Sequence, residues 1–313
     1  MIRSFFGLFT LLILITLGCD KVDNPYYQNQ GSADNEYGID TSFYVGNWPD
    51  YLANYYPDFE SAPANNQNVL LEDYTGHTCN NCPNAGALAH QIQDNNPGRV
   101  FVVAIHSGPG GMTSFQQYNP SNEQFYTNHT NPEGLEYGEA FEHGFNFFGN
   151  PQGTVNRRTV DGKLFDFTGT WSTRVTNELE NNPIVQIQSS FNYFPETQGG
   201  YLHLKVTKSL DLASPINTVV YVVQKKEYNW QVMPDNSYKE DYEHKNKHLG
   251  SIDKRPWGIF TFGLEDGQGE EVFLDYAYKL PEDIEPENLH LIIYSYNTEN
   301  HQILQVVKQE IVQ

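Results

Sequence analysis

The chain has 313 residues, which is enough for two domains of ordinary size. Its 39 Asp and Glu residues outnumber 18 Lys and Arg residues, giving a net charge of −21. This charge disfavours binding to nucleic acid and docking on anionic lipid headgroups, because both carry phosphate groups. Aromatic residues make up 14% of the chain, which is typical of strand-rich folds and of large contact surfaces.

The first 18 residues have the pattern of a secretory signal. Arg3 precedes an apolar stretch over residues 5–17, which is too short to span a bilayer, since a helix needs about 20 residues for that. A basic start, a short apolar run and a small residue such as Gly18 before the cut are typical of such signals. Cys19 follows directly, so the segment resembles a bacterial lipoprotein signal in which this cysteine carries the lipid. An ordinary signal peptide followed by a chance cysteine is the alternative.

A polar segment follows the predicted lipid site. Residues 20–42 are rich in Asn, Asp and Gly and have no apolar period, which predicts a flexible tether. Aromatic residues return over 43–63, where we expect a short helix around 51–56. We therefore assign residues 19–66 to the lipidated cysteine and its tether.

Residues 67–183 have the pattern of an α/β domain. A buried strand is predicted at 68–74, a helix with one apolar face after Cys82, and a nearly continuous apolar strand at 100–105. These elements make a β–α–β unit, for which a right-handed crossover is expected. The other elements expected here are an irregular insertion at 107–133, a helix at 133–145, strands at 154–158 and 163–167 joined by an Asp161-Gly162 turn, and a helix at 171–180.

After Pro183 the apolar period changes from helical to alternating, which is typical of strands with one buried face. No helix is predicted in this part of the chain. The pattern indicates an antiparallel β-sandwich over residues 184–313. The predicted strands lie at 185–193, 202–206, 219–223, 271–280, 288–296 and 302–312.

Two of the three cysteines, Cys79 and Cys82, lie between the first strand and the first helix of the α/β domain. A cysteine at a helix N-terminus faces unpaired N–H groups and the positive end of the helix dipole, which favour the thiolate. A disulfide between them closes a very short loop, so chain entropy gives it only about 2 kcal/mol as a structural clamp. The pair is therefore a candidate for thiol–disulfide chemistry.

The order of strand, Cys-x-x-Cys, amphipathic helix and strand, followed by a proline before a strand pair, resembles the thioredoxin fold. The resemblance implies that Cys79 is the exposed attacking cysteine and Cys82 the buried resolving one. It also implies a cis peptide bond at Pro151, beside the pair. Asp73, six residues before Cys79, matches the buried acid that helps to move a proton for the resolving thiol. These four residues are the candidate catalytic residues.

Several positions depart from the thioredoxin pattern. Thr78 stands where thioredoxins usually place Trp, and the proline is displaced to Pro83, beyond the second cysteine. The acidic pair Glu72 and Asp73 disfavours a thiolate nearby, and no Lys or Arg adjoins the cysteines. The pattern therefore supports the fold more strongly than it supports catalytic turnover.

A more specific resemblance rests on residues 72–83 together with Gly153-Thr154-Val155-Asn156-Arg157. These segments are similar to those of the Omp28-related outer-membrane lipoproteins, and the likeness extends over residues 67–313. It implies a thioredoxin-like half followed by a β-sandwich half on an outer-membrane lipoprotein. It implies no settled biochemical activity.

Histidines near the cysteine pair and in the segment 244–248 are the candidate metal ligands, and each has a structural alternative. His77 and His106 could join the two cysteines as zinc ligands, but the spacing lacks the usual second ligand pair. His244 and His248 could share a metal on a helix, whereas their segment is predicted to be a loop or an edge strand. No nucleotide or other cofactor fingerprint occurs, so no metal and no cofactor are predicted.

Two functions follow from these observations. The leading hypothesis is a binding or assembly role at the outer membrane, with the protein anchored through Cys19 and the sandwich contacting other envelope proteins. The rival is a membrane-tethered thiol–disulfide oxidoreductase, in which Cys79 attacks a substrate disulfide and Cys82 resolves the mixed intermediate. The pattern predicts neither the partner, nor the membrane face, nor the oligomeric state.

Overall fold

Four α-helices occur in the computed structural model, which describes residues 38–60 and 66–312. The predicted signal at 1–18 and the predicted lipid site Cys19 lie outside the described residues. None of the described helices is long and apolar enough to cross a membrane. The helices are α1 (Trp48–Asn54), α2 (Cys82–Asp94), α3 (Pro132–Ala140) and α4 (Trp171–Leu179), with 3-10 turns η1 (Ser114–Gln116), η2 (Thr168–Thr170) and η3 (Pro286–Asn288).

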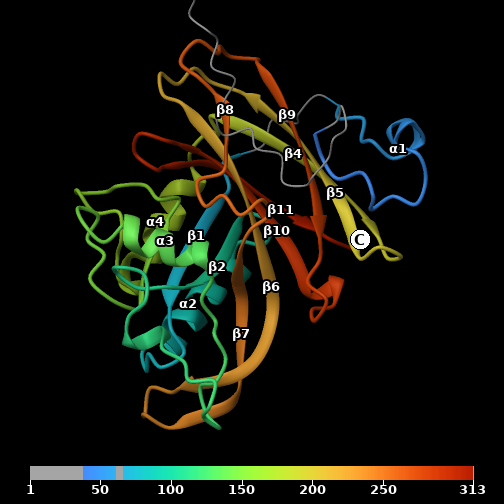
Figure 1. Ribbon diagram of the computed structural model, residues 1–313. Coiled ribbons are helices and arrows are strands. Elements are labelled where there is room, and N and C mark those ends of the chain that lie inside the picture. The colour runs from blue at the N-terminus through green and yellow to red at the C-terminus, as the bar shows by residue number, and fades with distance from the viewer. Residues whose placement is uncertain (1–37, 61–65, 313) are drawn as a thin grey trace, which may run out of the picture.

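Strands dominate the molecule and form two sheets (Figure 1). The larger sheet is mixed and runs in the order β11-β10-β6-β7-β2-β1-β3, with β8 paired to β6; the smaller sheet is antiparallel, in the order β4-β5-β9. The strands are β1 (Val69–Thr75), β2 (Val100–His106), β3 (Gln152–Val155), β4 (Val185–Phe194), β5 (Gly199–Lys208), β6 (Ile216–Val232), β7 (Tyr238–Ser251), β8 (Ile259–Phe262), β9 (Glu271–Lys279), β10 (Leu289–Asn297) and β11 (Ile303–Glu310).

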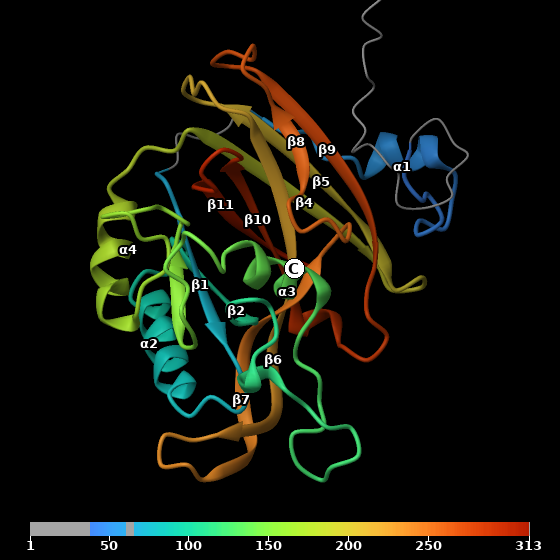
Figure 2. The same cartoon turned by 60° about the vertical axis from the view of Figure 1, so that its left-hand side comes forward.

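The predicted β–α–β unit is present, with β1 and β2 parallel along their whole length. Helices α2 and α4 lie on the same face of these strands (Figure 2). The small side chains Ala85 and Ala89 let α2 approach the sheet, and Trp171 begins α4 over Val155. Gly153 in β3 is required, because a Cβ there would lie 2.7 Å from the Trp171 ring. The β–α–β unit and the helix expected at 171–180 are therefore confirmed, whereas the helix expected at 133–145 is shorter (Pro132–Ala140) and the strand expected at 154–158 lies at Gln152–Val155.

The larger sheet crosses the boundary expected between residues 183 and 184. Strands β1, β2 and β3 precede that boundary and β6, β7, β10 and β11 follow it, and the two sets join where β2 and β7 pair in parallel at Ala104 and Lys247. The expectation of a self-contained antiparallel sandwich is therefore corrected: its larger sheet is mixed and continues into the α/β part. The physical reason is that β2 and β7 each present an edge whose polar groups need partners.

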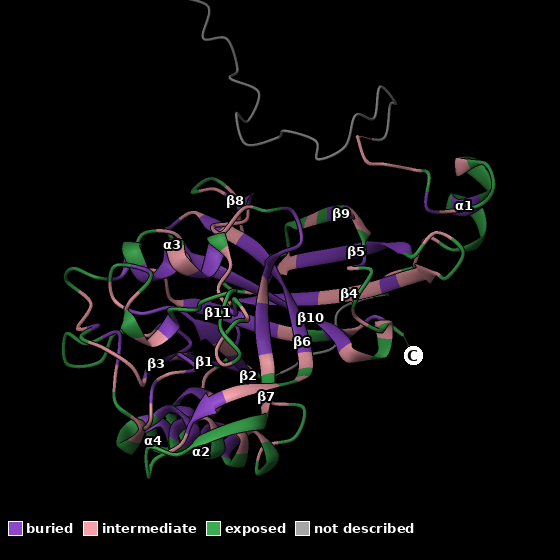
Figure 3. Cartoon of the chain, turned by 60° about the horizontal axis from the view of Figure 1, so that its bottom comes forward, coloured by how far each residue is buried: buried purple, intermediate pink, exposed green. Residues whose placement is uncertain are grey.

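Between the two sheets lies an aliphatic core. Alternate residues of the facing strands point into it, including Leu202 and Leu204 of β5, Val220 and Val222 of β6, and Leu291 of β10. Figure 3 shows both sheets largely buried, with exposed positions gathered on the helices and loops. This layer confirms that the C-terminal strands pack face to face, as their alternating pattern indicates.

The segment that contains α1 packs on the smaller sheet. Tyr201 of β5 accepts hydrogen bonds through its hydroxyl from the backbone N–H groups of Phe43 and Tyr44, at 3.1 and 3.2 Å. Tyr51 of α1 is fully buried, contacts His203 of β5 through its hydroxyl and stacks on Trp48. The expected short helix therefore lies at Trp48–Asn54, and part of the predicted tether belongs to the folded structure.

A buried ion pair joins the two parts of the chain. Arg157, just after β3, donates to both carboxylate oxygens of Glu72 in β1, at 2.7 and 2.8 Å, and neither side chain is exposed. Arg157 also donates to the Tyr221 hydroxyl of β6 at 2.7 Å, and that hydroxyl accepts from Tyr294 of β10 at 2.9 Å. The network therefore ties β1 and the β3 end to the C-terminal strands by charge-assisted hydrogen bonds.

Candidate functional site

The cysteine pair lies where β1 leads into α2, as the sequence indicates. Cys79 is in the turn after the strand, Cys82 is the first residue of α2, and the two form a disulfide. Pro83 occupies the first turn of α2, where its missing N–H removes no helical hydrogen bond. The local sequence alone therefore accounts for a disulfide at the start of this helix.

Both cysteines are buried. Cys79 is 1% exposed and Cys82 is 3% exposed. The expectation that Cys79 is exposed is therefore wrong, whereas its role as the attacking cysteine stays a prediction. The reason lies in two segments that are distant in sequence and cover the turn.

The end of the β6–β7 hairpin covers one side of the cysteine turn. The backbone N–H of Val232 donates to the carbonyl oxygen of His77 at 2.9 Å. The side chain of Gln231 donates to the carbonyl oxygen of Cys79 at 3.1 Å. This long hairpin extends below the body of the molecule in Figure 1. An element of the C-terminal part is thus hydrogen-bonded directly to the cysteine turn.

The insertion after β2 contacts the same turn. Thr78 donates its backbone N–H to the carbonyl oxygen of Phe115 at 3.2 Å, and its hydroxyl to the carbonyl oxygen of Ser114 at 2.9 Å. Gly76 permits this approach, because a Cβ there would lie 2.4 Å from the Phe115 oxygen. The chain therefore places its own backbone beside the residue that precedes Cys79.

The peptide bond between Asn150 and Pro151 is cis, as the thioredoxin resemblance implies. Gln116 in η1 donates to the carbonyl oxygen of Thr75 at 2.7 Å and to the side chain of Asn150 at 3.1 Å. The insertion therefore contacts both the end of β1 and the residue before the cis proline.

Asp73 lies in β1 and is almost completely buried, with no hydrogen-bond partner for its Oδ1 atom. Loss of solvent raises the pKa of this carboxyl from 3.8 to about 7. Asp73 and Cys82 line one cleft of about 600 Å³, together with Tyr242 and His244 of β7. The carboxyl is thus partly protonated at neutral pH, and it lies on the same cleft as Cys82.

Four histidines pack together near the cysteine turn. The ring of His129 lies 5.2 Å from that of His77, 5.0 Å from that of His106 and 4.7 Å from that of His244, measured between centroids. Burial lowers the pKa of His77 to about 4, that of His244 to about 3 and that of His106 well below its usual value, so these three rings are neutral at pH 7. Within residues 38–60 and 66–312 the side chains form no group arranged to hold a metal ion.

The residues considered as metal ligands take other roles in the structure. Both cysteines considered as zinc ligands are joined in the disulfide. His244 and His248 lie on a strand, where four residues span about 13 Å, and the ring of His248 packs on Tyr221 at 4.3 Å. His129 was not anticipated as a member of the cluster, because nothing in the insertion marks it as buried.

Comparisons with known proteins place the fold. No protein-family model matches the chain, and no curated protein matches it. HBP35 of Porphyromonas gingivalis superimposes with a TM-score of 0.57 at 16% identity, covering 79% of this chain and 76% of that protein. The two chains share a fold.

Two other solved structures are less similar. A protein of Agrobacterium tumefaciens is 14% identical, with a TM-score of 0.48, over 78% of this chain and 95% of that one. A domain of the outer membrane lipoprotein Omp28 from Porphyromonas gingivalis is 14% identical, with a TM-score of 0.28, over 41% of this chain and 88% of that one. At these TM-scores neither likeness carries an argument, so the predicted relation to the Omp28 group stays a prediction.

Proposed function

We propose that this protein is an envelope lipoprotein, anchored to the outer membrane through Cys19, that serves as a binding or assembly component. On this proposal residues 67–183 are a thioredoxin-like unit and residues 184–313 contribute the sandwich, joined through the shared sheet. The lipoprotein-like start of the sequence and the fold shared with HBP35 are compatible with it.

One observation carries the proposal: other segments of the protein shield Cys79. A thiol–disulfide enzyme must bring its attacking sulfur within bonding distance of a substrate sulfur, which requires access. Here Cys79 is 1% exposed, with the β6–β7 hairpin and the 114–116 turn bonded to its surroundings. The shielding of Cys79 favours a structural role for the disulfide within a binding scaffold.

Two exposed phenylalanines offer a contact surface for a partner. Phe148 is 74% exposed and Phe167 is 63% exposed. Both lie beside Gln152: the N–H of Phe148 donates to its side chain at 2.6 Å, and the pairing of Gly153 with Asp166 sets Phe167 next to it. Large exposed aromatic side chains are enriched where proteins bind one another.

The test is affinity capture from detergent-solubilised envelopes with the full chain as bait. A specific partner should be recovered with the wild-type protein and lost with a Phe148→Ser/Phe167→Ser variant. A Phe260→Ser variant, which changes another exposed phenylalanine on β8, should retain it. Recovery that is equal for all three baits, or absent for all three, would count against the proposed contact surface.

The alternative function, a tethered oxidoreductase, is favoured by Asp73. Its raised pKa and its position on the cleft shared with Cys82 suit proton transfer to the resolving thiol. In that reaction the reduced Cys79 thiolate attacks a substrate disulfide and releases one substrate thiolate. Cys82 then attacks the Cys79 sulfur, which re-forms the observed disulfide and releases the second substrate thiolate, so two electrons pass to the substrate.

Thiol labelling separates the two functions. After reduction, we expect Cys79 to react with iodoacetamide many times more slowly than a free thiol, because the hairpin shields it. A Gln231→Ala variant should label faster, since it loses the bond to the Cys79 carbonyl, whereas the exposed Gln268→Ala should not. Fast labelling of the wild type, together with substrate adducts on a Cys82→Ala variant, would instead establish the oxidoreductase.

A further inference from the structure

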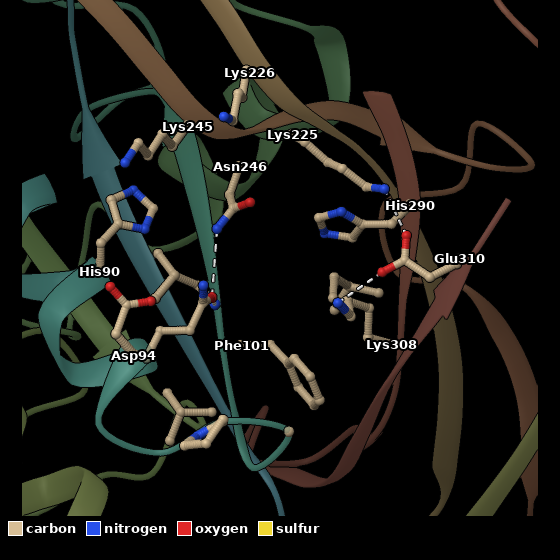
Figure 4. Close-up of a pocket in the computed structure, with 16 residues that line it drawn as sticks. His90, Asp94, Phe101, Lys225, Lys226, Lys245, Asn246, His290, Lys308 and Glu310 are labelled. Carbon is tan, nitrogen blue, oxygen red and sulfur yellow. Dashed lines mark hydrogen bonds and ion pairs between the residues drawn. The ribbon is translucent and has the colours of Figure 1, made fainter. Parts of the chain in front are cut away.

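A groove of about 530 Å³ lies between α2 and the strands β6, β7, β10 and β11 (Figure 4). It exists because β2 and β7 pair at a single position in the described residues, Ala104 with Lys247, and separate toward Val100. Gln93 fixes the helical wall, since its side-chain oxygen accepts the N–H of Val102 at 2.9 Å. The groove is thus built into the sheet, and its volume is typical of small-molecule sites.

Four lysines surround this groove, although the chain carries a net charge of −21. On one side Lys225 and Lys308 both pair with Glu310, at 2.7 Å each. Two ammonium groups therefore share one carboxylate. Within the described part of the chain, the two lysines on that side therefore have one carboxylate between them.

The other side repeats this arrangement. Lys226 and Lys245 both pair with Glu243, at 3.4 and 3.3 Å. Asp94 of α2 and Glu310 line the groove together with the four lysines, whereas Glu243 pairs with two of these lysines without lining the groove. The groove is therefore a locally cationic region on a strongly acidic protein, which favours a small anion over a second acidic protein surface.

The groove has an apolar floor and one polar atom there that lacks a partner. Figure 4 shows the Phe101 ring between His90 and Asp94 on one side and His290 and Lys308 on the other. His290 is 5% exposed and its Nδ1 atom has no hydrogen-bond partner. A buried nitrogen without a partner costs free energy that a bound ligand group would recover.

We propose that this groove binds an organic anion, whose phosphate or carboxylate group pairs with the lysines while its apolar body lies on Phe101. Lysine ammonium groups bind phosphate as mobile point charges, and here each pair of lysines shares a single carboxylate. The body of the ligand gains contact with a floor that also includes the buried Ile292. This groove does not include the disulfide. A test of anion binding here is therefore independent of the proposed binding or assembly function.

Calorimetry on the full chain with three probes tests the proposal. 1-Naphthyl phosphate has both the anionic group and an aromatic body, 1-naphthol lacks the charge, and inorganic phosphate lacks the body. We expect 1-naphthyl phosphate to bind in a 1:1 ratio, about tenfold or more tighter than either control, and to weaken with added salt. No binding, or equal binding of 1-naphthol, would overturn the anion site; equal binding of inorganic phosphate would overturn the apolar part of it.

Two variants with opposite expectations locate the site. Lys225→Gln/Lys308→Gln should weaken 1-naphthyl phosphate about tenfold or more, whereas Glu310→Gln should tighten it by freeing both lysines. The expected gain cannot come from damage to the fold. Lys279→Gln, which changes an exposed lysine on β9, is the matched control and should leave the affinity unchanged. Unchanged affinity in both groove variants would place the probe elsewhere and overturn the proposal.

Discussion

Replacing Glu72 by glutamine should lower the free energy of unfolding by about 3–5 kcal/mol, which is the usual cost of removing one partner of a buried ion pair. The variant leaves the Arg157 guanidinium fully buried without a counter-charge. It also weakens the acceptor for Tyr221, whose hydroxyl donates to Glu72 at 3.0 Å. Urea denaturation followed by circular dichroism measures the change.

The control for this prediction is a surface pair. Glu282→Gln removes an exposed carboxylate 3.9 Å from Lys279 and should cost less than about 1 kcal/mol. A double variant, Glu72→Gln with Arg157→Met, should be more stable than Glu72→Gln alone, because it no longer buries an unpaired charge. A loss in Glu72→Gln as small as that in Glu282→Gln would contradict the role given to the pair.

Replacing Asp73 by asparagine should stabilise the protein at pH 8, by up to about 4 kcal/mol. Burial raises the pKa of Asp73 from 3.8 to about 7, and that difference sets the size of the effect. Asparagine has a similar shape and carries no charge, so it avoids the cost of ionising a group away from solvent.

The sign of this effect depends on pH. Below about pH 3.8 the carboxyl is protonated in both the folded and the unfolded state, and it does not oppose folding. As pH rises from 3.8 to about 7, the unfolded state ionises first, so stability is progressively lost; above 7 the loss is constant. The gain in Asp73→Asn should therefore be present at pH 8 and absent near pH 3.5, in urea denaturation at both values. The exposed Asp241→Asn should show no such dependence, and a gain that is equal at both pH values would refute the assignment.

The β–α–β unit was predictable because its signals are local. The apolar run at 100–105 and the apolar helical face after Cys82 match β2 and α2 within a residue or two. The Asp161-Gly162 turn is also found, with both residues at positive φ and Val160 paired to Lys163. The strand expected at 163–167 is reduced to isolated bridges, since the arm after the turn pairs at only a few positions in the described residues.

The residues of the candidate site were predictable from the sequence, whereas the segments that surround them were not. The cysteine spacing and the cis bond at Pro151 agree with the resemblance, and Asp73 is buried on β1 as expected. The shielding of Cys79 was not predicted, because Gln231 lies more than one hundred residues away, beyond the strand predicted at 219–223, in a segment to which no element was assigned. The roles of these residues in a reaction stay predictions until the labelling experiment is done.

The sequence by itself determined the cysteine turn, the first parallel strand pair, the helices around it and the alternating strands that follow, because apolar period and turn residues act over short distances. Only the tertiary structure decided that β2 and β7 join the two parts in one sheet, that the β6–β7 hairpin covers Cys79, and that four lysines meet at a groove. Those contacts depend on which strand edges meet. Many strands that are distant in sequence offer the same backbone hydrogen bonds at their edges. Which two edges pair therefore depends on how the whole chain packs.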